Sequence, residues 1–200
     1  MFKKLIYNFI ISTSLIIILT TTSYAADDTN GYNIGDIVED FTIYNFDGGI
    51  YTLSNNEGPA TVIMFWSTQC PFVQPYTQRI SNLSNEFNNQ GIVFWAVNSN
   101  NTEDVDEVKS HAQEKGYPFP MLKDLNNVVA DQFGAERTPE IFLINNSNMK
   151  LLYHGRIDND KNKDKVTSED LRNALNEFLA GQDITVTDTK AFGCTIKRVD

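Results

Sequence analysis

The sequence predicts a single α/β domain whose partly parallel sheet is covered by helices on both faces. Its 200 residues suffice for one hydrophobic core of ordinary size and are too few for two. Two short apolar runs, residues 61–66 and 92–97, are typical of strands that are buried on both faces of a sheet. Apolar side chains at helical spacing lie between the runs, as expected where a helix connects two parallel strands.

In chain order, the first predicted elements are a β-hairpin, a buried strand and a helix. The hairpin lies within residues 34–53, where Asp47-Gly48-Gly49 separates two β-prone stretches. After the strand at 61–66, Pro71 is suited to the first position of a helix. Apolar residues then follow at helical spacing until Gly91 ends the element, namely Phe72, Tyr76, Ile80, Leu83 and Phe87.

The second half of the chain predicts two helices, a pair of strands and a last helix. After the strand at 92–97, Thr102 can cap an acid-rich helix that runs to Lys115-Gly116. The elements that follow are an extended segment at 118–122, a short helix at 126–133, strands at 140–145 and 150–155, and a helix that starts at 167–170 and ends at Gly181. The tail from Gln182 to Asp200 has no strong periodicity.

The N-terminus has the pattern of a secretory signal peptide. Lys3 and Lys4 precede an apolar run at residues 5–19, and Ser23-Tyr24-Ala25 offers small residues at the −3 and −1 positions. We expect cleavage after Ala25, with an uncleaved anchor as the alternative, although the run is short for a membrane span. This divides the chain into a signal peptide (1–25), a leader (26–33), a domain (34–185) and a C-terminal tail (186–200). The expected location is periplasmic or secreted, with membrane contact only during export.

Charge and composition argue against several other classes of protein. The formal net charge of −10 is unsuited to a nucleic-acid partner, because such surfaces need clustered lysine and arginine. Two histidines and two distant cysteines form no zinc pattern, and no glycine-rich phosphate loop is present. Residues 158–169 have EF-hand spacing, but Lys163 stands where the loop needs glycine, so we interpret them as a solvated acidic loop. No metal or cofactor is expected.

Cys70 is the main candidate for chemistry, because it lies between a buried strand and the predicted start of a helix. A helix N-terminus carries partial positive charge and free N–H groups, so a thiolate there is stabilised and the pKa of its thiol falls. The thiolate is the nucleophilic form of cysteine. In an exported protein, two cysteines also suggest one disulfide, Cys70–Cys194. From these residues alone, that pair is either a structural link or a redox pair.

The segment Phe65-Trp66-Ser67-Thr68-Gln69-Cys70-Pro71 resembles the active-site segment of thioredoxin-like proteins. It is most similar to redoxins, the alkyl hydroperoxide reductase/thiol-specific antioxidant or peroxiredoxin-like family. Further segments agree, so that the resemblance covers about residues 34–197: Ile34-Gly35-Asp36 with Asp40-Phe41-Thr42, then 134–143, 153–158 and 192–197. The resemblance implies a thioredoxin-like fold: a central mixed sheet with helices on both faces and an N-terminal β-hairpin.

The resemblance also implies roles for individual residues. Cys70 matches the redox-active cysteine, and Pro139, after Thr138, matches a cis-proline whose loop packs against that cysteine. Arg137 would then face the thiolate and lower its pKa, or else be a solvated surface charge. Ser67 would hydrogen-bond a peroxide or the thiolate, or else cap the loop.

The match to the family patterns is incomplete. Val73 stands where a thioredoxin has its second cysteine, so no local dithiol can form. A peroxiredoxin has proline seven residues before its cysteine and threonine or serine three before; Ile63 and Ser67 occupy these positions, so half of that signature is present. Cys194 is the natural resolving partner for Cys70.

The sequence therefore predicts an exported thiol oxidoreductase with antioxidant, peroxiredoxin-like activity. Cys70 would attack a peroxide oxygen or a disulfide sulfur, Cys194 would resolve the adduct, and an external thiol reductant would restore the pair. One alternative is thiol–disulfide exchange without peroxidase activity. Another is a non-catalytic binding domain whose structural disulfide contributes about 3–5 kcal/mol of stability.

Overall fold

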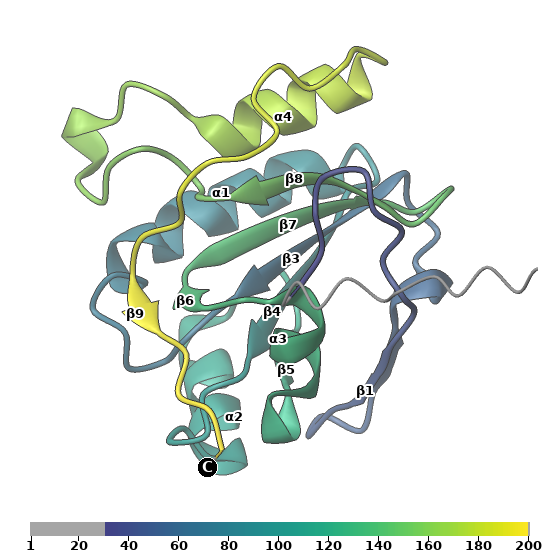
Figure 1. Ribbon diagram of the computed structural model, residues 1–200. Helices are drawn as coiled ribbons and strands as arrows, with labels where there is room; N and C mark the ends of the chain where they lie inside the picture. The colour runs from purple at the N-terminus through teal and green to yellow at the C-terminus, as the bar shows by residue number, and fades with distance from the viewer. Residues whose placement is uncertain (1–30, 200) are drawn as a thin grey trace, which may run out of the picture.

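The computed structural model describes residues 31–199, and a five-stranded mixed sheet forms its centre (Figure 1). The predicted signal peptide and most of the leader lie outside the described residues. The sheet has the strand order β5-β4-β3-β7-β8. Its strands are β3 (Ala60–Phe65), β4 (Val93–Asn98), β5 (Met121–Lys123), β7 (Glu140–Asn145) and β8 (Lys150–Gly155). Strands β3, β4 and β5 are parallel, in line with the partly parallel sheet that the sequence predicted, and β7 runs antiparallel to β3 and β8.

Helices cover both faces of this sheet. Helices α1 (Thr77–Asn88), α2 (Val105–Lys115) and α4 (Asp170–Leu179) contribute to one buried cluster. Helix α3 (Val128–Phe133) contributes to the cluster on the other face, together with the hairpin of β1 (Thr42–Tyr44) and β2 (Ile50–Thr52). Figure 1 shows α1 behind the sheet and α3 in front of it. None of the described helices is long and apolar enough to cross a membrane.

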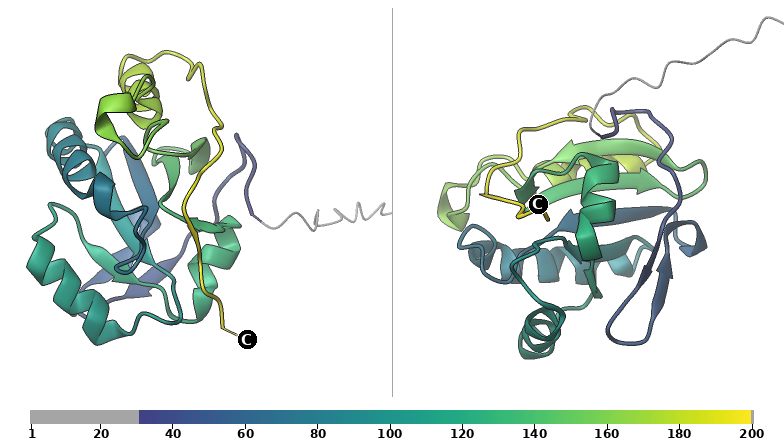
Figure 2. Two further views of the ribbon diagram at one scale, coloured as in Figure 1. Left: turned by 90° about the vertical axis from the view of Figure 1, so that its left-hand side faces the viewer. Right: turned by 60° about the horizontal axis from the view of Figure 1, so that its bottom comes forward.

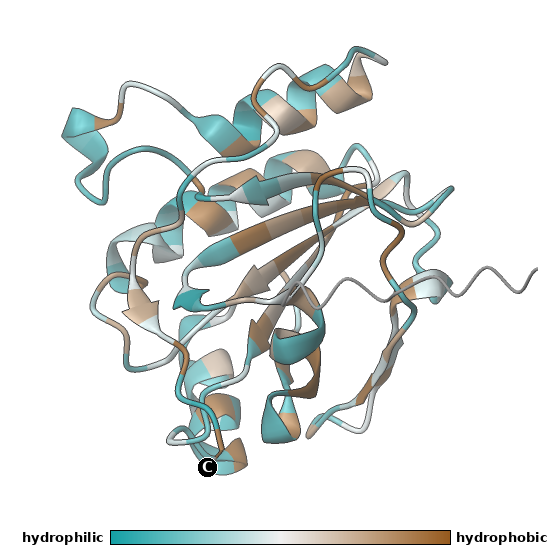
Figure 3. Ribbon diagram, viewed as in Figure 1, coloured by the Kyte–Doolittle hydropathy of each residue, from teal (hydrophilic) through white to brown (hydrophobic). Residues whose placement is uncertain are grey.

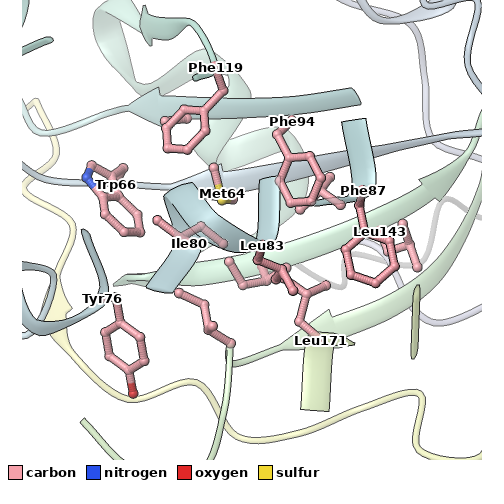
Figure 4. Close-up of a cluster of buried hydrophobic side chains, with 14 of the residues drawn as sticks. Met64, Trp66, Tyr76, Ile80, Leu83, Phe87, Phe94, Phe119, Leu143 and Leu171 are labelled. Atoms are coloured by element: carbon pink, nitrogen blue, oxygen red, sulfur yellow. The ribbon is translucent and has the colours of Figure 1, made fainter. Parts of the chain in front are cut away.

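The alternating side chains of the central strands supply both cores. All six residues of β3 are buried; Val62 and Met64 belong to one cluster and Ile63 and Phe65 to the other. The central strands are accordingly among the most hydrophobic segments in Figure 3. Figure 4 shows the α1 side of the core, where aromatic and aliphatic side chains from the sheet, α1 and α4 interdigitate. A continuous apolar run of this length is what a strand with two covered faces requires.

The segment after Cys70 differs from the prediction. Residues 71–73 form a turn, Gln74–Tyr76 form a 3-10 helix, and α1 begins only at Thr77. Pro75 explains the delay, because it has no N–H to donate to the carbonyl of Pro71 and its ring disfavours an α-helical turn there. The prediction that the α-helix begins at Pro71 is therefore wrong, because a turn and a 3-10 helix separate Cys70 from α1. The expected stabilisation of the Cys70 thiolate stays a prediction.

Other boundaries shift by a few residues. Asp104, and not Thr102, caps α2, since its carboxylate accepts the backbone N–H of Glu107 at 2.8 Å. Further 3-10 helices span Leu53–Asn55, Leu125–Asn127 and Lys163–Lys165.

The aperiodic C-terminal tail is packed against the domain. A two-residue strand, β9 (Cys194–Thr195), pairs antiparallel with β6 (Arg137–Thr138), and Asp188 forms a bridge to His154 at the end of β8. Figure 2 shows the tail running along one side of the molecule. No sequence periodicity predicts a strand of two residues, so this pairing is a finding of the structure.

Candidate functional site

The structure brings Cys70 and Cys194 together from 124 positions apart in the chain. Their Cα atoms are 6.0 Å apart and their sulfur atoms lie at disulfide distance. Cys70 follows β3, whose burial fixes the start of the loop, and Cys194 opens β9. The two cysteines of the sequence are therefore positioned to form the expected disulfide.

The cis-proline loop, residues 136–139, contacts both cysteines through Thr138, the last residue of β6. The Thr138–Pro139 peptide bond is cis, as the resemblance implied. The carbonyl oxygen of Thr138 lies 3.3 Å from the sulfur of Cys70, and Thr138 is the β-pairing partner of Cys194. Thr138 thus contacts both cysteines, next to the cis bond to Pro139.

Gly193 makes this close approach possible. A Cβ atom at this position would lie 2.0 Å from the carbonyl oxygen of Thr138, a distance that no side chain tolerates. Glycine therefore allows the strand with Cys194 to lie directly on the cis-proline loop. Gly193 lies in the family-like segment 192–197, but the resemblance implied no role for it.

Ser67 holds the loop that carries Cys70. Its hydroxyl oxygen accepts the backbone N–H of Cys70 at 3.0 Å, and the same hydroxyl donates its proton to the carboxylate of Glu103. A serine hydroxyl has one proton. Because Glu103 takes that proton, Ser67 has none left for a peroxide or a thiolate, and of its two expected roles the geometry supports capping of the loop.

The buried side chain of Glu103 accepts the hydrogen bonds that hold the loop carrying Cys70. Its place in the site was not predicted from the sequence. Its side chain is almost fully enclosed, with 2% of the residue exposed. It accepts the backbone N–H of Thr68 at 2.7 Å and the side-chain amides of Asn98 and Asn100 at 2.5 and 2.8 Å. Burial alone would raise the pKa of Glu103, but the hydrogen bonds it accepts outweigh burial and hold that pKa below 4.5.

Arg137 lies beside Cys194 and is half-buried, so it is not the freely solvated charge of the alternative interpretation. Its guanidinium donates to the carbonyl oxygen of Gly193 at 3.4 Å. That bond supports the strand that carries Cys194. The expected effect of Arg137 on the Cys70 thiolate stays a prediction.

A second buried carboxylate, that of Glu140, accepts hydrogen bonds from the backbone of the cis-proline loop. One of its oxygens accepts the backbone N–H groups of Glu136 and Arg137, both at 2.8 Å. Its other oxygen lies 2.7 Å from the Nε2 atom of His154. Burial lowers the pKa of His154, but Glu140 and Asp188 of the tail outweigh burial and raise that pKa above 6.5. His154 therefore connects the loop to the tail.

The acidic segment at 158–169 is not simply a solvated loop. Asp158 is buried and forms an ion pair with Arg79 of α1, whose guanidinium also donates to the carbonyl oxygens of Asp160 and Lys161 at 3.0 and 2.7 Å. The arginine thus engages the carboxylate of Asp158, the first position of the EF-hand spacing. Among residues 31–199, no three histidine, cysteine, aspartate or glutamate side chains are grouped to hold a metal ion.

Known proteins share this architecture and sequence pattern. The family model described as AhpC/TSA family matches residues 34–153. The thiol-disulfide oxidoreductase ResA of Oceanobacillus iheyensis is 26% identical over 170 residues, which cover 80% of this chain and 88% of that protein. The alignments with the ResA proteins of Halalkalibacterium halodurans, Oceanobacillus iheyensis and Geobacillus thermodenitrificans span 62%, 88% and 95% of the lengths of those proteins.

Solved structures agree with this match. A hypothetical protein from Sinorhizobium meliloti is 32% identical, with a TM-score of 0.78 over 85% of this chain and 97% of its own. The thioredoxin domain of a thiol-disulfide oxidoreductase from Bacteroides vulgatus superposes with a TM-score of 0.60, over 74% of this chain and 99% of that domain. Because the identity to that domain is 16%, it shows the fold alone. The family model covers more than half of the chain, which therefore belongs to the AhpC/TSA family and has a thioredoxin-like fold.

Proposed function

We propose that this protein is a thiol–disulfide oxidoreductase that works through the pair Cys70 and Cys194. The observation that carries the proposal is the meeting of these two cysteines beside the cis bond of Thr138–Pro139. The similarity to proteins named thiol-disulfide oxidoreductase ResA supports the same chemistry.

The reaction is a two-electron exchange between this pair and a substrate disulfide. In the reduced protein, one cysteine thiolate attacks a substrate sulfur, and one substrate thiolate leaves. The second cysteine then attacks the mixed disulfide, so that the second substrate thiol leaves and the Cys70–Cys194 bond forms. An external thiol reductant returns two electrons to the pair and completes the cycle. The substrate is thus a disulfide, and the second partner is a thiol.

Peroxide reduction is the second candidate, favoured by the match to the AhpC/TSA family model. The Cys70 thiolate would attack a peroxide oxygen, giving a sulfenic acid and an alcohol or water. The Cys194 thiol would then displace water and form the disulfide. Ser67 gives this reaction no help as a donor, because its proton is bonded to Glu103. This geometry makes disulfide exchange the preferred candidate.

Turnover of both substrates by three variants tests the proposal. Cys70→Ser and Cys194→Ser should each abolish catalytic turnover of a disulfide with an external thiol reductant, because a single cysteine cannot complete the cycle. Thr195→Ala is the control, since Thr195 is exposed and next to Cys194. Circular dichroism verifies that each variant is folded. Unchanged turnover in either cysteine variant would show that the pair is a structural link. A wild-type protein that turns over only peroxide would favour the second candidate.

We also propose that the protein is exported and acts in the periplasm or outside the cell. The support is the N-terminal pattern of Lys3, Lys4, the apolar run at 5–19 and the small residues before Ala26. Export would place the cysteines where disulfides persist and would make the reductant a thiol of that compartment. Cell fractionation and N-terminal sequencing should find a soluble chain that begins at Ala26. A chain retained in the cytoplasm with Met1 intact would contradict this proposal.

A further inference from the structure

We propose that Cys194, and not Cys70, is the sulfur that exchanges with external thiols and disulfides. This inference rests on the proposed function and reverses the roles that the sequence predicted for the two cysteines. It begins with their burial. Cys70 is 3% exposed and belongs to the same buried cluster as Trp66, Val73 and Tyr76. Cys194 is half-buried: it packs against the edge of the same cluster, on a tail at the surface of the domain.

Thiol–disulfide exchange depends on which sulfur an incoming thiolate can reach. The two sulfurs of one disulfide differ here in surroundings, because the protein encloses Cys70 almost completely and Cys194 only in part. The carbonyl oxygen of Thr138, 3.3 Å from the Cys70 sulfur, and the strand that carries Cys194 both lie against Cys70. A substrate as large as a peptide therefore meets Cys194 first.

Opening the disulfide need not uncover Cys70, because hydrogen bonds fix the tail on both sides of Cys194. After it, the N–H of Ile196 donates to the carbonyl of Glu136 and that of Lys197 to the side chain of Asn100, both at 2.8 Å. Before it, Thr187 and Thr189 exchange backbone hydrogen bonds of 2.9 and 3.0 Å with His154. The reduced protein thus keeps Cys70 covered and Cys194 accessible.

The order of bond changes follows from this geometry. During reduction of the protein, a thiolate RS⁻ attacks the Cys194 sulfur, the bond to Cys70 breaks, and Cys70 leaves as a thiolate that takes a proton. A second RS⁻ attacks the R sulfur of the Cys194 adduct, releasing RSSR and the Cys194 thiolate. With a substrate disulfide the steps run in reverse: Cys194 forms the mixed disulfide, and Cys70 then attacks the Cys194 sulfur and releases the substrate thiol. Two electrons move in each direction.

The test compares two single-cysteine variants. Cys70→Ser leaves Cys194, and Cys194→Ser leaves Cys70. Each reduced variant is mixed with glutathione disulfide or 5,5′-dithiobis(2-nitrobenzoate), and adduct formation is followed by absorbance and mass spectrometry. Rates are measured against pH up to their plateau, so that thiolate reactivity is compared independently of thiol pKa. We expect the plateau rate of the Cys70→Ser variant to exceed that of the Cys194→Ser variant at least tenfold. In 6 M guanidinium chloride, where both thiols are exposed, the two rates should converge.

A second variant tests whether the docked tail is the cause. Gly193→Ala, added to Cys194→Ser, forces the strand away from the carbonyl of Thr138 and should raise the rate at Cys70. Gly181→Ala is the control substitution, because a Cβ there meets no atom within 4 Å.

The two proposals fail in different ways. If Cys70 reacts as fast as Cys194, or faster, in the folded variants, the assignment of Cys194 is overturned while the oxidoreductase function stands. If neither folded variant reacts with a disulfide and both react when unfolded, the proposed function fails, and this inference fails with it.

Discussion

At the scale of single residues, two features shape the site: the absence of a side chain at Gly193 and the single hydroxyl proton of Ser67. Where the tail crosses the cis-proline loop, there is no space for a Cβ atom at Gly193. Space, and not a left-handed backbone conformation, is what requires glycine there. Ser67 has no spare proton because Glu103 accepts the only one it has. Both features determine how Cys70 and Cys194 meet, and neither leaves a periodic signal in the sequence.

Gly193→Ala should therefore loosen the tail and lower stability. The added methyl group would overlap the carbonyl oxygen of Thr138, and overpacking of this kind costs about 1–3 kcal/mol. Urea unfolding of the reduced protein measures the change. Gly181→Ala, in open space at a φ of 69°, reports the cost of alanine in a left-handed conformation alone, about 1–2 kcal/mol. A Gly193→Ala variant as stable as the wild type would contradict the close approach at Gly193.

Glu103→Gln should destabilise the loop that carries Cys70. An amide NH₂ would face groups that donate hydrogen bonds, so a buried donor loses its acceptor at a cost of about 1–3 kcal/mol. Because the folded pKa of Glu103 is depressed, the stability it contributes is present above pH 4.5 and is lost as pH falls through that folded pKa.

Urea unfolding at pH 7 and at a series of pH values below 4.5 measures this contribution, with Glu107→Gln as the control. Glu107 also contacts Thr68 but is half-buried, so its variant should lose less. A Glu103→Gln protein as stable as the wild type at pH 7 would contradict the buried role of Glu103.

Two kinds of site residue could be predicted from the sequence: the two cysteines, because the chain has no others, and residues that belong to a recognisable motif. Cys70 and Cys194 are the only cysteines, and the segment Thr138-Pro139 lies in a family pattern. Glu103 could not be separated from its neighbours Asp104, Asp106 and Glu107, since an acidic stretch before a helix normally faces solvent. Only the three-dimensional path of the loop turns Glu103 inward.

At the scale of elements, the tail and the cis-proline loop act as one unit. Glu140 binds two N–H groups of the loop, and His154 binds Glu140 on one side and approaches Asp188 of the tail at 3.7 Å on the other. The pairing of β6 with β9 adds the direct contact between loop and tail. A change of charge at His154 therefore affects both segments that hold Cys194.

The stability that His154 contributes should decline as pH rises. Its folded pKa lies above 6.5, so the contribution of its protonated form is fully present below about pH 6 and is lost as pH rises through the folded pKa. His154→Gln should remove this pH dependence. His111→Gln is the control and should retain it, because burial lowers the pKa of His111 in the wild type. Thermal unfolding from pH 5.5 to 9 measures the effect. A pH dependence that survives in His154→Gln would contradict the assignment.

The elements that the sequence predicted well are those with a strong hydrophobic pattern. Strands β3 and β4 are continuous apolar runs, and Ile80, Leu83 and Phe87 are spaced as one face of α1. The start of α1 was wrong because the effect of Pro75 on the preceding turn outweighs the apolar spacing of Phe72 and Tyr76. Strand β9 was missed because two residues that pair with a distant loop have no local signature.

At the scale of the whole molecule, the bond between Cys70 and Cys194 closes a loop of 124 residues. A loop of this length restricts the unfolded chain and is expected to add about 5 kcal/mol to stability in the chain-entropy model. Reduction should lower the free energy of unfolding by about that amount while leaving the fold intact, because hydrogen bonds hold the tail. Urea unfolding with and without a reductant, and of a Cys70→Ala/Cys194→Ala variant, checks this. Loss of the native circular dichroism spectrum upon reduction alone would contradict it.

The most direct test of the account is the reduction potential of the Cys70–Cys194 disulfide in the folded protein. Equilibration with thiol–disulfide buffers, followed by alkylation and mass spectrometry, gives this potential while circular dichroism monitors the fold. A redox pair should be reduced reversibly in the native state at a potential above about −300 mV. A bond that stays closed until the protein unfolds would contradict the account and identify the pair as a structural link.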